Sequence, residues 1–330
     1  MAGKRKATTS RKSSAARTKA PAITKRQEQI IRKYAKKKGK KEVGLPFFLI
    51  ICLIIAGTVL LKYFEDNSGY IDADGTLSVH FIDVGQGDST LVISNGETML
   101  IDCGESSAAD KVTSYLTSVG VDKLDYIVAT HPHSDHMGGM AEVIDTFDVG
   151  EVIMPALADD DIPTSKYFEK CLDSCESKNV TIEQAQLGQI ITVGGASAEV
   201  VAPCSTGYSD VNNYSVSLDI TFGRTSFLLT GDAEELSEKE MLENGTVTHA
   251  TVYKAGHHGS RYSSSEEFLD VVSPEIAVIS CGAGNSYGHP NQEALDRISA
   301  YTDRIFRTDQ NGNVVMTSDG ENVEVNTERN

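Results

Sequence analysis

From residue 77 onward, short apolar runs alternate with segments of helical periodicity. Residues 77–84 (LSVHFIDV) and 89–94 read as strands joined by a Gly-rich turn, and YIVAT at 126–130 is continuously apolar, as in strands buried on both faces. Further strands are expected at 98–102, 151–154, 198–202, 216–222, 226–230, 251–254, 276–280 and 313–317, and helices at 108–119 and 137–147. This mixture predicts an α/β (α+β) domain in which helices cover mixed sheets.

Residues 43–61 (VGLPFFLIICLIIAGTVLL) have a different pattern, with no ionisable group except Cys52. At about 1.5 Å per residue, a helix of this length nearly spans a hydrocarbon core of about 30 Å. A buried core helix and a cleaved signal peptide are the alternatives. The run lacks a polar stripe, and 58–61 (TVLL) offers no small-x-small cleavage site. The sequence therefore predicts an uncleaved transmembrane anchor.

The charge of the chain divides at the same place. Residues 1–42 hold 16 Lys and Arg against two Glu, a net +14, so the remaining residues carry −31 within an overall −17. The basic segment reads as a disordered tail. Because Lys and Arg stay on the cytoplasmic side, we expect a single-pass protein of the cell membrane with a cytoplasmic N-terminus, a linker at 62–76 and an extracellular domain at 77–330. The tail is expected to bind anionic lipid, with nucleic acid as the alternative.

The acidic part is long enough to bury a substantial core, because 40% of the chain is apolar. Its densest cluster of potential metal ligands is THPHSDHMGG at 130–139. His131, His133, Asp135 and His136 lie within six residues, directly after an apolar strand. Imidazole and carboxylate together suit Zn, Mn or Fe better than Ca. The sequence therefore predicts a metal site on this loop.

The pattern His-x-His-x-Asp-His at 131–136 resembles the signature of the metallo-β-lactamase superfamily. Other segments resemble, in the same order, the metallo-hydrolase domain of ComEC-type DNA-uptake (competence) proteins: FIDVGQGDSTLV (81–92), LIDCG (100–104), NNYSVSLDI (212–220), FLLTGD (227–232), KAGHHGS (254–260) and YGHPN (287–291). The resemblance implies a four-layer αββα sandwich, two mixed sheets with outer helices and a two-metal site at one edge.

The resemblance also implies the ligands of two divalent ions, Zn or Mn. They are His131, His133, Asp135, His136, Asp232, His257 and His258. The first two would bind the first ion, Asp135 and His136 would begin the second site, and Asp232 would bridge the ions. Either His257 or His258 would complete the second site, and we favour His258 slightly.

One usual ligand has no counterpart. Most superfamily members supply a third His to the first metal from a loop before the bridging Asp, but no His occurs from 137 through 248. Asn212, Asn213 and Ser215 fall in the equivalent stretch and could hold a water or a phosphate oxygen. Cys204 is an alternative ligand.

These ligands predict hydrolysis. Two divalent ions about 3.5–4 Å apart can share a water, lower its pKa and present hydroxide to an ester. We expect Asp135, Asn213 and His289 to be catalytic, His289 as phosphate donor or leaving-group acid, with a structural turn histidine as the alternative. Three carboxylates at strand ends would orient metal-bound His: Asp83, Asp88 and Asp102.

The resemblance implies a phosphodiesterase or nuclease that acts on DNA outside the membrane. A net charge of −31 opposes this, because it repels a polyanion. We therefore keep two alternatives, a hydrolase of smaller phosphodiesters such as phosphorylcholine esters, and a non-catalytic metal-binding interaction domain. The six ligand positions matched together argue against the second.

Overall fold

The structure, a computed structural model, describes residues 75–330. The predicted tail (1–42) and anchor (43–61), with most of the predicted linker, lie outside the described residues. Within 75–330 no helix combines the length and apolarity needed to cross a membrane.

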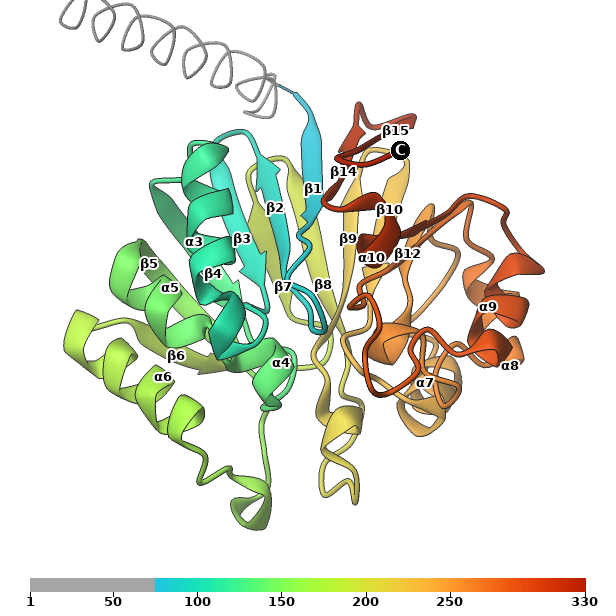
Figure 1. Cartoon of the computed structure of the whole chain (residues 1–330). Coiled ribbons are helices and arrows are strands. Elements are labelled where there is room, and N and C mark those ends of the chain that lie inside the picture. Colours follow the sequence, from blue (N-terminus) through green and yellow to red (C-terminus); the bar gives the residue numbers. More distant parts are fainter. Residues whose placement is uncertain (1–74) are drawn as a thin grey trace, which may run out of the picture. The chain divides into compact units, whose positions relative to one another are not determined.

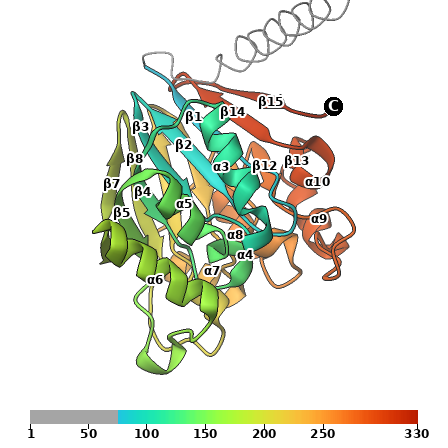
Figure 2. The ribbon, with the colours of Figure 1, turned by 60° about the vertical axis from the view of Figure 1, so that its left-hand side comes forward.

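The strands form two mixed sheets (Figures 1 and 2). The first has the order β15 (Val323–Thr327), β14 (Val314–Ser318), β1 (Leu77–Phe81), β2 (Thr90–Ser94), β3 (Glu97–Ile101), β4 (Lys123–Val128), β5 (Asp148–Met154) and β6 (Thr181–Gln184). The second has the order β13 (Ile305–Arg307), β12 (Ile276–Ile279), β11 (Val252–Lys254), β10 (Thr225–Leu229), β9 (Ser217–Phe222), β8 (Ala196–Ala202) and β7 (Ile190–Val193). In both sheets an antiparallel part continues into a parallel part, from β3 to β6 and from β10 to β13.

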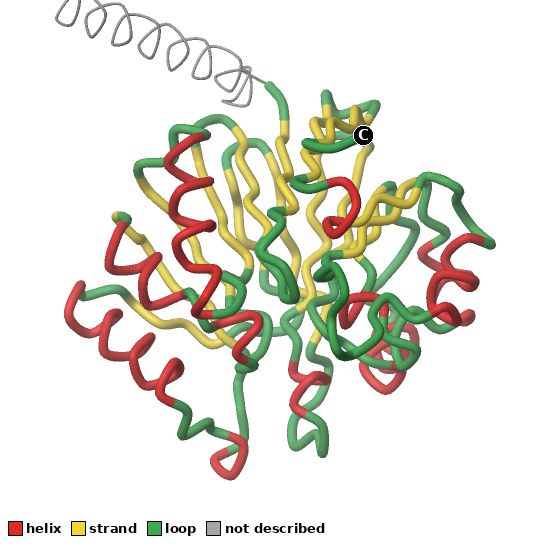
Figure 3. Tube along the Cα trace, viewed as in Figure 1, coloured by secondary structure: helices red, strands yellow, loops and turns green. Residues whose placement is uncertain are grey.

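Helices cover the outer face of each sheet, as the helix and strand colours of Figure 3 show. The first sheet carries α3 (Ala109–Ser118), α5 (Met140–Thr146) and α6 (Lys166–Lys178), and the second carries α7 (Glu235–Asn244), α8 (Glu266–Val272) and α9 (Gln292–Ser299). Two single-turn helices, α4 (Ser134–Met137) and α10 (Thr308–Asn311), lie in loops, as do the 3-10 turns η2 (Ser106–Ala108), η3 (Asp159–Asp161), η4 (Val211–Tyr214) and η5 (Gly256–Gly259).

Three apolar cores separate these four layers. Successive side chains of β3 point to opposite faces of the sheet. Met99 and Ile101 enter the core between the two sheets, and Leu100 packs under the outer helices. In β10, Phe227 joins the same central core and Leu228 faces α7 and α8. The predicted αββα sandwich is confirmed.

The strand predictions hold best where the sequence is apolar. β6 (TIEQ), β7 (IITV), β13 (IFR) and β15 (VEVNT) were not expected, because they are short, exposed or polar on one face. The helix predicted at 137–147 divides at Gly138 and Gly139. A Cβ at Gly138 would lie 2.3 Å from the Ser134 carbonyl oxygen, and one at Gly139 would lie 2.4 Å from that of Cys103. The two glycines let α4 pack closely against the loop after β3.

Glu238 of α7 is a buried carboxylate that should make stability depend on pH. It accepts hydrogen bonds from the amides of Ser264 and Ser265, yet burial raises its pKa to about 7. A raised pKa means that its contribution is complete below the unfolded value and is lost as pH rises through about 7. Relative to Glu238→Gln, the wild type should lose up to about 3 kcal/mol between pH 4.5 and pH 7.5. Denaturant unfolding of both proteins across this range measures the difference, and parallel curves would contradict it.

Candidate metal centre

The predicted ligands come from loops that follow strands of both sheets. His131 to His136 follow β4, Asp232 follows β10, and His257 and His258 form the turn after β11. Because β4, β10 and β11 belong to the parallel parts of their sheets, these loops leave the sheets at their carboxyl ends. The structure thus brings residues up to 127 positions apart in sequence to one edge of the sandwich.

Asp232 is the shared member of the cluster. Its Oδ1 lies 3.3 Å from His136 Nε2, and its Oδ2 lies 3.9 Å from His131 Nε2 and 3.5 Å from His258 Nε2. All four side chains are at most 2% exposed. The amide of Asp232 donates to Ser215 Oγ at 3.0 Å, which fixes the turn that carries the carboxylate.

Asp135 and His133 flank this group from the first loop. Asp135 Oδ2 lies 3.2 Å from His258 Nε2, and Asp135 Oδ1 lies 4.0 Å from His136 Nε2. His133 Nδ1 lies 2.9 Å from His131 Nε2. The loop therefore carries its four polar side chains to the same place as Asp232.

Both His257 and His258 reach the cluster. The sequence alone could not establish this, because it does not show which way adjacent side chains point. His257 and His258 have left-handed backbone angles, φ 48° and 56°, which are uncommon for residues other than Gly. His257 Nε2 lies 3.7 Å from Asp232 Oδ2, while His257 Nδ1 lies 3.1 Å from Glu234 Oε1. Glu234 thus orients one ring and the Ser280 carbonyl, 3.0 Å from Nδ1 of His258, orients the other.

Carboxylates hold two rings in place behind the cluster, as expected for Asp102 and Asp88. Asp102 Oδ2 lies 2.7 Å from His136 Nδ1 and also accepts the hydroxyl of Thr130. Asp88 Oδ1 lies 3.4 Å from His258 Nδ1. The expectation is wrong for Asp83, whose carboxylate pairs with Arg329 instead.

The segment from 137 to 248, which contains no histidine, contributes contacts to the histidines of the cluster. Ser215 Oγ lies 3.4 Å from His131 Nδ1, and Asn212 Nδ2 lies 3.5 Å from His257 Nδ1. Asn213 is buried, and its Oδ1 accepts backbone amides at the start of α7, so its predicted catalytic role remains a prediction. The Cys204 thiol donates to the Val201 carbonyl. No cysteine belongs to the potential metal-ligand groups found among residues 75–330.

His289 lies beside the cluster on the loop after β12. Its ring centroid is 5.3 Å from that of His257, and its Nδ1 is buried without a hydrogen-bond partner in the described part of the chain. Burial and the neighbouring His257 and His258 lower its pKa to about 4, so the ring is neutral at pH 7. His289 can therefore offer a neutral N–H or a lone pair to a bound group.

Within the cluster, carboxylates and imidazoles stabilise each other's charged forms. Burial opposes a charge on His136, but the carboxylates of Asp232 and Asp102 raise its pKa well above the usual value. In the same way Asp232 and Asp88 outweigh burial and raise the pKa of His258 to about 10. Burial also acts against the Asp232 carboxylate, yet His136 and His258 hold its pKa well below the usual value.

The residues fit a divalent cation. His136 Nε2 and Asp232 Oδ1 are buried, and neither has a hydrogen-bond partner in residues 75–330. They face each other at 3.3 Å without forming a hydrogen bond, and a cation bound between them would satisfy both atoms. Four groups of side chains have ligand atoms within 4.8 Å of one another: His131, His136 and Asp232; Asp135, His136 and His258; Asp88, Asp102 and His136; and Asp88, Asp232 and His258. Histidine and carboxylate donors match Zn and Mn chemistry.

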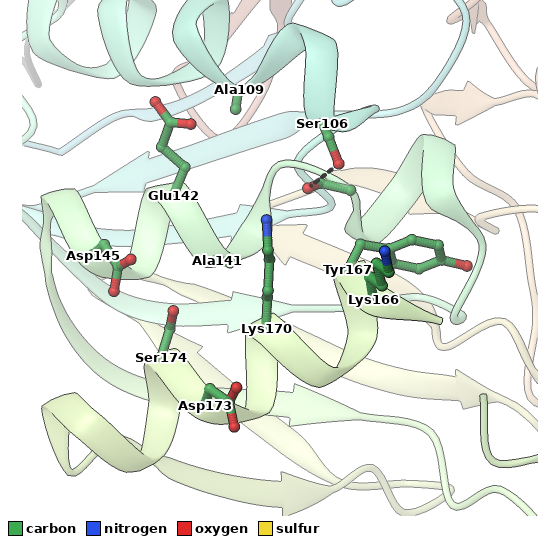
Figure 4. Close-up of a pocket in the computed structure, with 11 residues that line it drawn as sticks. Ser106, Ala109, Ala141, Glu142, Asp145, Lys166, Tyr167, Lys170, Asp173 and Ser174 are labelled. Atoms are coloured by element: carbon green, nitrogen blue, oxygen red, sulfur yellow. Dashed lines mark hydrogen bonds between the residues drawn. The ribbon is translucent and has the colours of Figure 1, made fainter. Parts of the chain in front are cut away.

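A pocket lies away from the cluster, on the outer face of the first sheet. It measures about 580 Å³ and lies between α5 and α6, with Lys170 reaching across it (Figure 4). The hydrogen bond from Ser106 to the Gly138 carbonyl closes one end. None of the predicted metal ligands lines this pocket.

An αββα sandwich with a His and Asp cluster at one edge defines the class of metallo-hydrolase folds. The chain belongs to the metallo-beta-lactamase superfamily, whose family model matches residues 82–283. Its relatives confirm the resemblance to ComEC-type domains.

Three curated relatives are competence or recombination proteins by name. ComE operon protein 3 of Bacillus subtilis (strain 168) is 32% identical over 254 residues, which cover 72% of this chain and 32% of that protein. Recombination protein 2 of Haemophilus influenzae is 29% identical over 244 residues, covering 72% and 28%. Competence protein ComA of Neisseria gonorrhoeae is 32% identical over 232 residues, covering 70% and 30%. The chain thus spans about a third of the length of these relatives.

The cluster should be sensitive to a single methyl group at Gly87. A Cβ there would lie 2.4 Å from the Asp135 carbonyl oxygen, so Gly87→Ala must displace the backbone of a predicted ligand. Gly85 also has a positive φ, but a Cβ there meets nothing within 4 Å. We expect Gly87→Ala to weaken Mn²⁺ binding roughly tenfold or more, and Gly85→Ala to retain it, in calorimetric titrations. Equal affinities in the two variants would contradict the close approach.

Proposed function

We propose that this protein is a metal-dependent phosphodiesterase anchored in the cell membrane. The supporting observation is the shared, buried Asp232, whose Oδ1 and the facing His136 Nε2 lack hydrogen-bond partners in the described residues. A bound cation would satisfy both of these buried atoms. Membership of a superfamily of hydrolases and the names of the relatives support the same reading.

The residues divide into roles around two ions, Zn or Mn. Bound divalent ions would supply Lewis acidity and acidify a water molecule near neutral pH. In this proposal Asp135, His136 and His258 hold the second ion, and Asp232 serves both ions. His131 and His133 hold the first. His257, which points its Nε2 at Asp232 from a ring oriented by Glu234, stands in for the absent third histidine.

His289 would contact the substrate, not the metals. Its ring is half-buried beside His257, and we propose that it hydrogen-bonds a phosphate oxygen or the leaving group. Such a contact positions the ester without needing a charged side chain.

DNA is the substrate that the resemblance to DNA-uptake proteins implies, but the charge of the domain favours contact with only a short stretch of nucleic acid. With −31 outside the basic tail, a long duplex would be repelled away from the metals. We therefore propose cleavage of single-stranded ends or short nucleic acid. A hydrolase of small phosphodiesters such as phosphorylcholine esters is the second candidate, favoured by the same charge.

Replacing Asp232 should abolish hydrolysis. The full-length protein loaded with Mn²⁺ or Zn²⁺ is expected to cleave bis(p-nitrophenyl) phosphate, and Asp232→Asn should reduce turnover to background because it removes the shared carboxylate. Asp83→Asn is a matched control, since that carboxylate pairs with Arg329 and touches none of the predicted ligands. Comparison of single-stranded DNA with a phosphorylcholine ester then separates the two candidates. Full metal occupancy without turnover on any ester would instead favour a non-catalytic metal-binding domain.

We also propose that residues 43–61 anchor the domain on the outer side of the membrane, with the basic tail inside on anionic lipid. The sequence pattern alone supports this topology. A reporter that is active only outside the membrane, fused after Asn330, should show activity, and the same reporter fused before Met1 should not. Activity only from the N-terminal fusion would reverse the orientation.

A further inference from the structure

Lys254 is a buried cation next to the predicted metal site. It ends β11, three residues before the tandem histidines, and its side chain is 2% exposed. Its Nζ pairs closely with Asp88 Oδ2, and its remaining hydrogen bond goes to the Ala255 carbonyl at 3.4 Å. Burial of an ammonium group is unfavourable unless an anion pairs with it, so the buried Lys254 side chain depends on Asp88.

The partner of Lys254 lies directly behind two predicted ligands. Asp88 Oδ1 is 3.4 Å from His258 Nδ1, and Asp88 Oδ2 is 4.0 Å from His136 Nδ1. The backbone also fixes Asp88, because its amide donates to the Asp135 carbonyl and its carbonyl accepts the Gly104 amide. Asp88 therefore sits where it could itself join the metal ligands, in two of the four groups described above.

The two charges constrain each other. Without Lys254, the Asp88 carboxylate would be a free anion close to two imidazoles and would compete for a cation. Without Asp88, the Lys254 ammonium would repel divalent ions at short range in a poorly screened interior. Together they present almost no net charge to the cluster.

We propose that Lys254 and Asp88 act as a positioning pair for the second metal site, an inference that rests on the proposed function. Lys254 holds the Asp88 carboxylate behind the ligands, 3.4 Å from His258 Nδ1, where its charge supports the hydrogen bond of Nδ1 with the Ser280 carbonyl. In this orientation His258 Nε2 faces Asp135 and Asp232. The pair thus sets which atoms are offered to the metal without binding it.

Three variants test the pair: Lys254→Met, Asp88→Asn and the double variant. Calorimetric titration of the full-length protein with Mn²⁺ measures binding, and thermal unfolding without metal measures stability. Each single variant leaves a buried charge unpaired and should unfold at lower temperature. The double variant should regain stability without metal, yet bind the second Mn²⁺ at least tenfold more weakly than the wild type, since removal of orienting groups typically costs 10–100-fold in metal affinity.

A second pair of similar kind provides the control. Arg307 and Asp309 form an ion pair with a 2.7 Å contact and belong to none of the four ligand groups, so Arg307→Met with Asp309→Asn should leave Mn²⁺ affinity unchanged. Wild-type affinity in the Lys254 and Asp88 double variant would overturn the positioning role while leaving the proposed function intact. A wild-type protein that binds no Mn²⁺ or Zn²⁺ would overturn both.

Discussion

The structure of the site depends on one electrostatic constraint: a fully buried carboxylate, Asp232, is surrounded by imidazoles within 4 Å. Burying these groups together is unfavourable unless their charges are balanced. The carboxylates stabilise positive charge on the neighbouring rings and raise the pKa values of His136 and His258. Bound divalent cations would supply positive charge to the same carboxylate.

The rest of the fold serves to hold this arrangement rigid. Apolar cores on both faces of each sheet fix the strands, and the ligands sit on short turns directly after them. Outer contacts then fix the rings, through Asp102 and Thr130 for His136 and through Glu234 for His257. Left-handed backbone at two successive non-glycine residues is uncommon, and here it turns neighbouring side chains toward one centre.

Most of the ligand set could be predicted from the sequence, because the ligands lie in short motifs. The cluster at 131–136 was identifiable from residue type and spacing, and Asp232 from the resemblance of the segment FLLTGD to the family's pattern. The sequence could not show that His257 and His258 both reach the cluster, because adjacent side chains normally diverge and the backbone angles decide otherwise. Glu234 and Lys254 were missed, since a carboxylate at a helix start and a lysine at a strand end usually face solvent. The edge strands β6 and β15 escaped prediction because neither has a buried residue, so neither shows a continuous apolar face.

Both sheets contribute ligands to the centre, and this has a consequence for how the domain unfolds. One sheet supplies the loop from His131 to His136, and the other supplies Asp232 and the tandem histidines. An ion bound between them would therefore tie the two layers together. Separation of the layers would then release the metal, so bound metal would stabilise the sandwich against unfolding.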